Sequence, residues 1–307
     1  MKALYTLLVV GLLVSLFPVQ AALRAGALVV DATPKQLPVH VNGGMRQREI
    51  SEIGSPITVR AIALNDGKTE LAIVEAARLN GLPLSCHPVV NAGPRAPQLG
   101  SPRLRAVEIG DPFMMAIGLW GGLCARAGFV VHDESELPMS IQDYVEVIVK
   151  PYYTAAVAWY ETIGIGVTGG EIYTLIEEML ADHPFRMALN PGHAIHLDEW
   201  VHSGIYPRST CRLSSGMALQ LDIIPMCDDE AYFTINVEDG IALADASLRS
   251  KLSEKHPETW SRIQARRQFM HDTLGIHLKE EVLPFSNMPA VLRPYLLSPH
   301  LALRVNR

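Results

Sequence analysis

Three short segments in the second half of the chain place one histidine and two acidic residues where they constrain both fold and chemistry. In the first, 190–200, His193 follows an Asn-Pro-Gly turn. The second, 217–222, is a Gly-Met strand pattern that ends at Asp222, and the third, 235–243, carries Glu238 in an apolar strand pattern. Together the three residues form an ordered set of one histidine and two acids.

From Asp111 onward the pattern is that of an α+β domain. Strands are predicted at 113–119, 129–131, 217–225 and 232–237, and helices at 142–163, 171–181, 242–252 and 259–273. Pro151 is expected to kink or split the first helix. The pattern G-x-G-x-x-G at 164–169 follows a helix, not a strand, so we interpret it as a turn between helices.

Five segments carry a resemblance to the pita-bread peptidase family, which includes methionine aminopeptidase, Xaa-Pro peptidases and creatinase. They are Trp120–Gly128, Gly164–Glu171, Asn190–Trp200, Glu238–Asp245 and Leu283–Asn287. The resemblance implies a partial pita-bread domain over residues 111–307. It further implies an Xaa-Pro aminopeptidase-like hydrolase, acting on C–N bonds of short peptides or small creatine-like molecules. A homodimer is expected on the same ground.

The chain departs from this family at two metal-ligand positions. Catalytic members hold two divalent metals with two aspartates, a histidine and two further acids. Aligning Gly110-Asp111 and the following residues with the family motif puts Ala116 at the first aspartate, and Ala127 lies eleven residues later at the second. Alanine has no donor atom, so the resemblance predicts a degenerate site in which His193, Asp222 and Glu238 remain.

Three interpretations stay open for these remaining residues. They could hold one manganese, cobalt, zinc or iron ion for hydrolysis. They could also work without a metal, as in creatinase, with His193 or His196 moving protons. The third interpretation is a non-catalytic binding protein.

Two more residues are predicted to bind substrate. Arg126, beside Ala127, could hold a substrate carboxylate in a bidentate contact. Asp198 shares an extended segment with His196, so their side chains are expected on one face.

The N-terminal part of the chain has a different character. Residues 1–22 resemble a secretory signal cleaved near Ala21, which predicts export to the periplasm or the extracellular space. Residues 23–79 are β-rich and similar to the start of neutral ceramidases, although no zinc-binding histidines follow. That similarity leaves a remnant of a ceramidase-like hydrolase as a further alternative. Residues 80–110 are rich in proline and glycine and are predicted to form a linker.

The composition of the chain limits the classes of partner that we expect it to bind. The net charge of −6 provides no basic surface for nucleic acid, so a small molecule or short peptide is the expected partner. No apolar run after residue 22 is long enough to cross a membrane.

Overall fold

The structure is a computed structural model that describes residues 24–31, 39–41, 48–50, 58–65, 84–85, 89–96, 105–119, 122–195 and 202–306. The chain divides into two compact units, one formed by residues 1–41 with 49–81 and the other by 42–48 with 82–307. The signal-like residues 1–22 lie outside the described residues, so the prediction of export stays a prediction. Among the described residues, no helix has the length and apolar character needed to span a bilayer.

The smaller unit is β-rich, as expected. Strand β1 (Arg24–Asp31) pairs antiparallel with β4 (Thr58–Asn65), and β2 (Val39–Val41) pairs with β3 (Arg48–Ile50). The predicted second arm of a hairpin after Asn65, at 70–75, lies outside the described residues.

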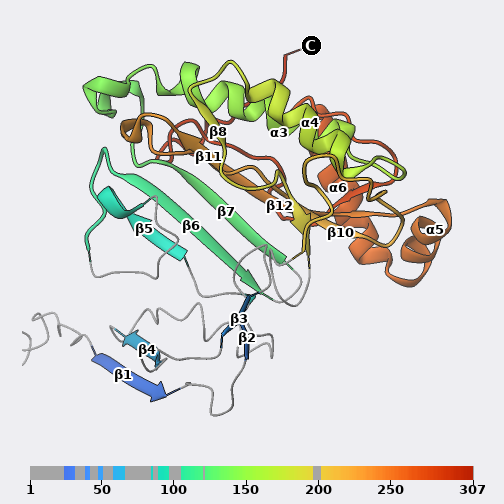
Figure 1. The fold of residues 1–307 in the computed structure, drawn as a ribbon, viewed down its shortest axis with the longest axis horizontal. Coiled ribbons are helices and arrows are strands. Elements are labelled where there is room, and N and C mark those ends of the chain that lie inside the picture. The colour runs from blue at the N-terminus through green and yellow to red at the C-terminus, as the bar shows by residue number, and fades with distance from the viewer. Residues whose placement is uncertain are drawn as a thin grey trace, which may run out of the picture. The chain divides into compact units, whose positions relative to one another are not determined.

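The larger unit contains a sheet of seven strands in the order β5-β6-β7-β12-β10-β9, with β13 paired to β12 (Figure 1). All of its registered pairs are antiparallel. The strands are β5 (Val89–Ala92), β6 (Pro112–Leu119), β7 (Gly122–Phe129), β9 (His193–Ala194), β10 (Ala218–Asp222), β12 (Asn236–Leu243) and β13 (Val282–Pro284). Two shorter strands, β8 (Phe185–Met187) and β11 (Pro225–Cys227), pair with each other. The predicted α+β class is thus confirmed.

The linker prediction for residues 80–110 is wrong at Val89–Ala92. These residues form β5, which pairs with β6 from Val89↔Ala116 to Ala92↔Phe113. The prolines and glycines around this stretch suggested a linker, but the β-branched pair Val89-Val90 is typical of a strand. An edge strand tolerates flanking proline because one of its sides needs no hydrogen bonds.

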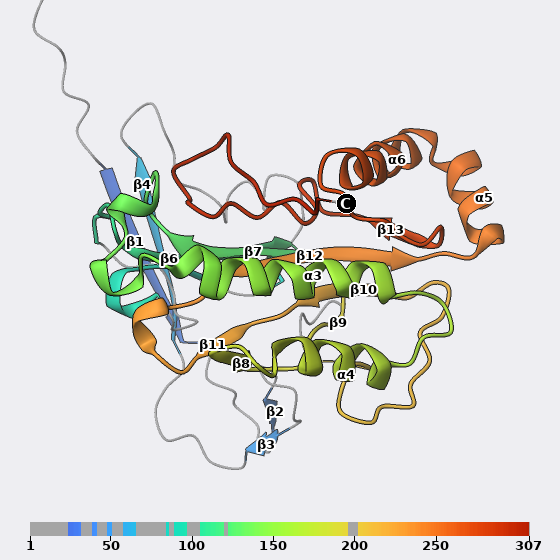
Figure 2. The same ribbon diagram turned by 90° about the horizontal axis from the view of Figure 1, so that it is seen from above.

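Helices α3 (Lys150–Thr162) and α4 (Gly169–Leu180) lie side by side on one side of the larger sheet (Figures 1 and 2). Pro151 does not split this helix, since helical residues run without a break from 144 to 162. A π-helical segment, Val145–Val149, leads directly into α3, and Pro151 lies in the first turn of α3. The π-helical turn shifts the local hydrogen bonds, as in that from the Lys150 N–H to the Val145 carbonyl, and so accommodates a proline that has no N–H.

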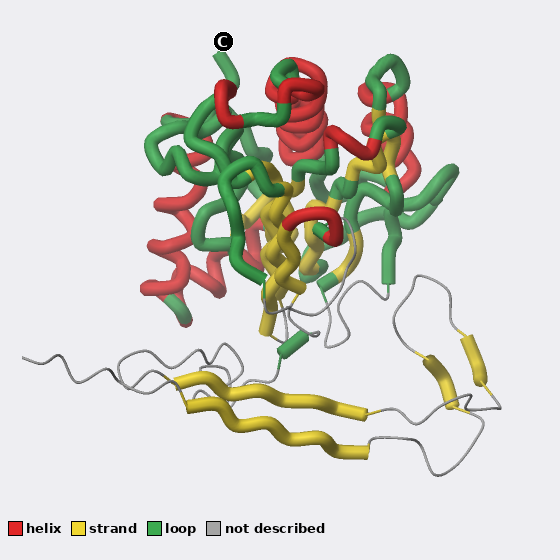
Figure 3. Tube along the Cα trace, turned by 90° about the vertical axis from the view of Figure 1, so that its left-hand side faces the viewer, coloured by secondary structure: helices red, strands yellow, loops and turns green. Residues whose placement is uncertain are grey.

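The glycine-containing connection 164–168 joins α3 to α4, as predicted. Thr168 caps α4 in a reciprocal box, since its hydroxyl accepts from the Glu171 N–H and the Glu171 carboxylate accepts from the Thr168 N–H. Figure 3 shows the helices in red around the yellow strands of this unit.

The last elements are displaced from their predicted positions. The strand expected at 232–237 begins only at Asn236, because Glu230–Tyr232 forms a short 3-10 turn. Helices α5 (Ala246–Lys255) and α6 (Pro257–Asp272) follow it. Asp245 caps α5 by accepting from the Leu248 N–H, which explains why that helix begins after the predicted start at 242.

Tyr152 connects α3 to the first residues of β12, which do not pair with β10. Its hydroxyl accepts from the Val237 N–H at 2.8 Å and donates to the Val237 carbonyl at 3.3 Å. The pairing of β10 with β12 ends at Asp222↔Glu238, so this hydroxyl supplies partners that the next strand residue would otherwise provide.

We predict that Tyr152→Phe lowers the free energy of unfolding by about 1–3 kcal/mol, because it leaves the buried Val237 N–H without its hydrogen bond. Chemical denaturation of the two proteins measures the difference. Tyr153→Phe is the matched control on the same helix. The Tyr153 hydroxyl is buried and has no hydrogen-bond partner among the described residues, so its removal should be neutral or stabilising. Equal losses in both variants would contradict the prediction.

Candidate metal centre

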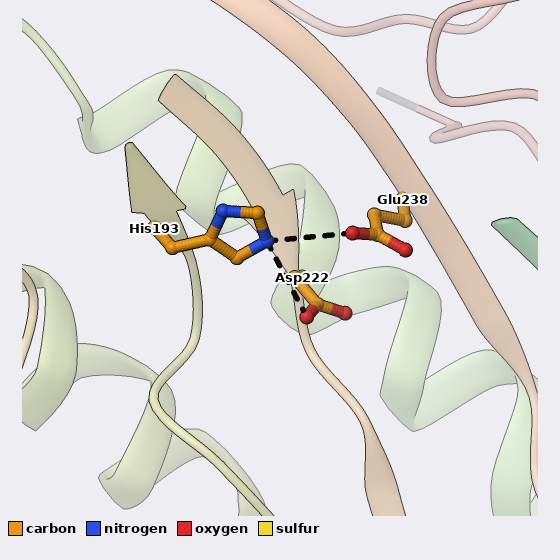
Figure 4. Close-up of side chains that lie close together, drawn as sticks. All are labelled: His193, Asp222 and Glu238. Atoms are coloured by element: carbon orange, nitrogen blue, oxygen red, sulfur yellow. Dashed lines mark hydrogen bonds and ion pairs between the residues drawn. The ribbon is translucent and has the colours of Figure 1, made fainter. Parts of the chain in front are cut away.

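Three adjacent strands bring together the three residues singled out in the sequence. His193 lies at the start of β9, Asp222 at the end of β10 and Glu238 near the start of β12 (Figure 4). His193 Nε2 is 3.4 Å from Glu238 Oε1 and 3.7 Å from Asp222 Oδ2. All three residues are at most 5% exposed. The structure therefore brings these three side chains together, and their role stays a prediction.

The sheet register explains why they share one face. Side chains of directly paired residues point to the same side of a sheet, and alternate residues along a strand do the same. Asp222 pairs with Glu238, and His193 pairs with Gln220, which is two residues before Asp222. We call the face that carries these side chains the cluster face. Leu219, Leu221 and Val237 point the other way and join the hydrophobic core with Tyr152 and Trp159 of α3.

The imidazole of His193 is held in one orientation. Its Nδ1 lies 3.1 Å from the Ala194 carbonyl, and a carbonyl can only accept, so Nδ1 carries the hydrogen. In the neutral ring, Nε2 then carries the lone pair, and this atom faces the two carboxylates (Figure 4). Metal-binding histidines commonly have this arrangement, with the second ring nitrogen donating to a backbone carbonyl.

Charge in the cluster is unbalanced when all three groups are in their ordinary states. Burial opposes a charged ring, but the hydrogen bond to Glu238 and the charge of Asp222 outweigh it and raise the pKa of His193 to about 9. Burial, followed by the charge of Asp222, raises the pKa of Glu238 to about 7. A proton on the ring therefore offsets part of the negative charge that two neighbouring buried carboxylates would carry.

The same geometry fits a divalent cation. One ligand atom from each of the three residues lies within 4.8 Å of the others, so a single ion between them could reach all three. Among the described residues, no other group of three or more His, Cys, Asp or Glu meets this condition. One nitrogen and two oxygen donors suit zinc, manganese, iron or cobalt and leave further coordination positions open.

Gln220 supports the cluster, although the sequence analysis did not single it out. Its Nε2 donates to Glu238 Oε1 at 2.8 Å and to the Leu123 carbonyl at 2.8 Å, and its side chain is fully buried. The carboxylate of Glu238 is thereby fixed relative to β7. The available signal was the alternation of β10, which places residue 220 on the same face as Asp222.

The register shows how Ala116 and Ala127, the alanines expected at two ligand positions, lie relative to each other. Ala116 pairs with Ala125, and Ala127 pairs with Met114, so Ala116 and Ala127 are diagonal neighbours and do not face each other. The strands pair up to Leu119↔Gly122, which leaves only residues 120 and 121 between them and fixes this offset. All three alanines are buried on the cluster face, and Ala125 pairs directly with Glu238.

Arg126 lies on the opposite face, and its contacts differ from the predicted ones. Its guanidinium forms an ion pair with Asp239 at 2.8 Å and donates to the carbonyls of Ala125, Met288 and Val291. It also lines an apolar groove of about 390 Å³ with Phe113 and Met115. None of the cluster residues lines this groove. Arg126 thus does not supply a substrate-binding charge at the His193 cluster.

The remaining predicted site residues follow His193 in the chain. His196 and Asp198 lie outside the described residues, so their roles stay predictions. His202 is exposed, and its backbone carbonyl accepts from the Ala194 N–H. This hydrogen bond places His202 beside β9.

No protein-family model matches the chain, and no curated protein sequence matches it. Solved structures do. An Xaa-Pro dipeptidase from Bacillus anthracis is 20% identical with a TM-score of 0.44, and the match covers 55% of this chain and 47% of that one. A prolidase from Pyrococcus furiosus is 16% identical (TM-score 0.43, 55% and 49% covered). An X-Pro aminopeptidase from Thermotoga maritima is 19% identical (TM-score 0.41, 56% and 48% covered).

These structures are peptidases of the family expected from the sequence. The matched region spans about half the length of each solved chain. None of these comparisons bears on the ceramidase-like segment, which stays a prediction.

We predict that Gly192→Ala destabilises the protein by about 2 kcal/mol or more and displaces His193. Gly192 has φ of +136°, and an added Cβ would lie 2.6 Å from the Gln220 carbonyl oxygen of the neighbouring strand. Thermal unfolding and the chemical shift of the His193 ring measure the two effects.

Gly216→Ala is the control, since its φ of +90° gives backbone strain while no atom lies within 4 Å of the added Cβ. If both variants lose the same stability, the close approach to β10 contributes nothing and the prediction is wrong.

Proposed function

We propose that the chain binds one divalent transition metal through His193, Asp222 and Glu238 and hydrolyses C–N bonds in short peptides or small amidino compounds. The observation that carries this proposal is that the Nε2 lone pair of His193 points toward two buried carboxylates. The three ligand atoms all lie within 4.8 Å of one another. Without a cation, such a group is stable only when protons neutralise it. A divalent cation would replace those protons directly.

The residues of the chain have separate tasks in this proposal. His193 supplies the nitrogen donor, and its Nδ1–H bond to Ala194 keeps Nε2 available. Asp222 and Glu238 supply oxygen donors and negative charge, while Gln220 fixes Glu238 by a hydrogen bond to Oε1. A metal in this position would polarise the scissile carbonyl and lower the pKa of an attacking water. Burial of the cluster strengthens each of these electrostatic effects.

A second candidate function is proton transfer without a metal. Its support is that the pKa of Glu238 (about 7) lies at neutral pH while that of His193 (about 9) lies above it, so at neutral pH the ring holds a proton and Glu238 can take up or release one. In that case a small molecule would bind at the cluster and exchange a proton with His193, and a chelator would not affect turnover.

We predict that the purified chain binds about one manganese, cobalt, zinc or iron ion and that His193→Ala and Glu238→Gln each lose it. Losing one of three ligands should weaken binding by at least roughly 100-fold, because the two remaining donors cannot enclose the ion. Elemental analysis after dialysis, followed by titration of the stripped protein, measures content and affinity.

His300→Ala is the matched control, since His300 is exposed and far along the chain from the cluster strands. Equal metal content in His193→Ala and His300→Ala would place the metal elsewhere. If the folded wild-type protein binds no metal, the metal proposal is wrong. The proton-transfer function and a non-catalytic protein are then the two remaining explanations.

Metal affinity is predicted to rise with pH between 6 and 9. Both pKa values are raised, so the free protein holds a proton on Glu238 up to about pH 7 and on His193 up to about pH 9. The metal must displace these protons, which makes Kd fall by up to roughly 100-fold per pH unit below 7 and roughly tenfold per unit between 7 and 9. Calorimetry in buffers of different ionisation enthalpy counts the released protons. An affinity that is constant over this range would contradict the assignment.

A further inference from the structure

Asn236 is a buried polar residue on the cluster face whose side chain makes no hydrogen bond. It is 1% exposed, and among the described residues neither its Nδ2 nor its Oδ1 has a partner. A buried carboxamide without partners is costly to a folded protein, so such groups in native structures call for an explanation. Sites that bind a ligand commonly retain this cost, because the ligand supplies the missing hydrogen bonds.

The position of Asn236 relative to the metal centre follows from the strand. It lies two residues before Glu238 on β12, so both side chains project from the same face about 7 Å apart. Its neighbour across the strand pair is Ala127, and the neighbour of Glu238 is Ala125. Two methyl groups therefore flank the carboxamide and the carboxylate on β7, and they provide no hydrogen bond to either.

On the other side of Glu238 along β12, the cluster face offers no comparable hydrogen-bonding side chain among the described residues. Beyond Glu238 on the cluster face comes Gly240, which has no side chain, and Gln220 already donates to Glu238 and Leu123. On this face of β12, Asn236 is accordingly the side chain whose donor and acceptor are both available to a molecule held at the cluster.

We propose that Asn236 is a substrate-positioning residue, whose carboxamide binds an oxygen of a short peptide held at His193, Asp222 and Glu238. The Nδ2 group donates to the carbonyl or carboxylate oxygen of the peptide, and Oδ1 accepts an N–H where the peptide has one. This inference rests on the proposed function, because it assigns the substrate class of the same site. The binding group lies on the side of Glu238 where Ala127, its neighbour on β7, provides no hydrogen-bonding atom.

The test uses the full chain, loaded with manganese, and alanylproline as the probe. Asn236→Leu keeps the size of the side chain and removes both polar atoms. We expect it to bind alanylproline about tenfold more weakly or worse, the effect of one lost hydrogen bond, while its manganese content stays unchanged. We also expect its melting temperature to rise, because an unsatisfied buried amide has been removed.

Asn287→Leu is the matched control, since Asn287 is exposed and accepts from Arg266 away from the cluster. It should leave peptide affinity unchanged. A purely structural role for Asn236 predicts the opposite pattern, a lower melting temperature with unaltered peptide affinity, and that result would overturn the inference. Failure of the wild-type protein to bind alanylproline would overturn it as well.

The two proposals fail in distinguishable ways. If the wild-type protein takes up no manganese but still binds alanylproline, and Asn236→Leu weakens that binding, the metal proposal is wrong and the role of Asn236 stands. If Asn236→Leu loses the metal itself, Asn236 belongs to the metal centre and its assignment to the substrate is wrong.

Discussion

The structure around the candidate centre depends on two buried carboxylates that face one imidazole nitrogen. Asp222 and Glu238 are directly paired across β10 and β12, so the sheet itself holds like charges together. Such an arrangement costs free energy unless a cation lies between them. Either a proton on His193 or a metal ion can provide that positive charge. Both proposed activities follow from this one constraint.

The surrounding residues are organised to keep this group in place. Gly192 allows β9 to approach the Gln220 carbonyl, Gln220 fixes Glu238, and Tyr152 supports the end of β12. On the opposite face, Arg126 neutralises the adjacent buried Asp239. The neighbouring acids Glu238 and Asp239 thus have different surroundings. Asp239 has its own internal counter-ion, Arg126, whereas Glu238 shares His193 with Asp222. This asymmetry supports the assignment of Glu238, and not of Asp239, to the proposed centre.

Much of this could be predicted from the sequence, for reasons that are local. The alternation of 217–222 and 235–243 places Asp222 and Glu238 on strands, and the Pro-Gly turn introduces His193. The register could not be predicted, because it depends on pairing between strands far apart in the chain. That register moved Ala127 opposite Met114, set Arg126 on the other face and made 89–92 a strand of the sheet. Gln220 and Asn236 were missed because neutral amides give no charge pattern. The hydrogen bonds of Gln220 reveal its role, and burial without hydrogen bonds reveals the cost of Asn236.

X-ray absorption spectroscopy of the manganese-loaded chain is the most direct test of a mononuclear centre. The account predicts one imidazole nitrogen and carboxylate oxygens at roughly 2.0–2.3 Å, with the imidazole signal absent in His193→Ala. No second metal is expected at the separation of roughly 3.5–4 Å that is typical of paired centres, because the described residues contain only one group of three His, Cys, Asp or Glu ligands. A metal–metal distance in that range, or an unchanged spectrum in His193→Ala, would contradict the account.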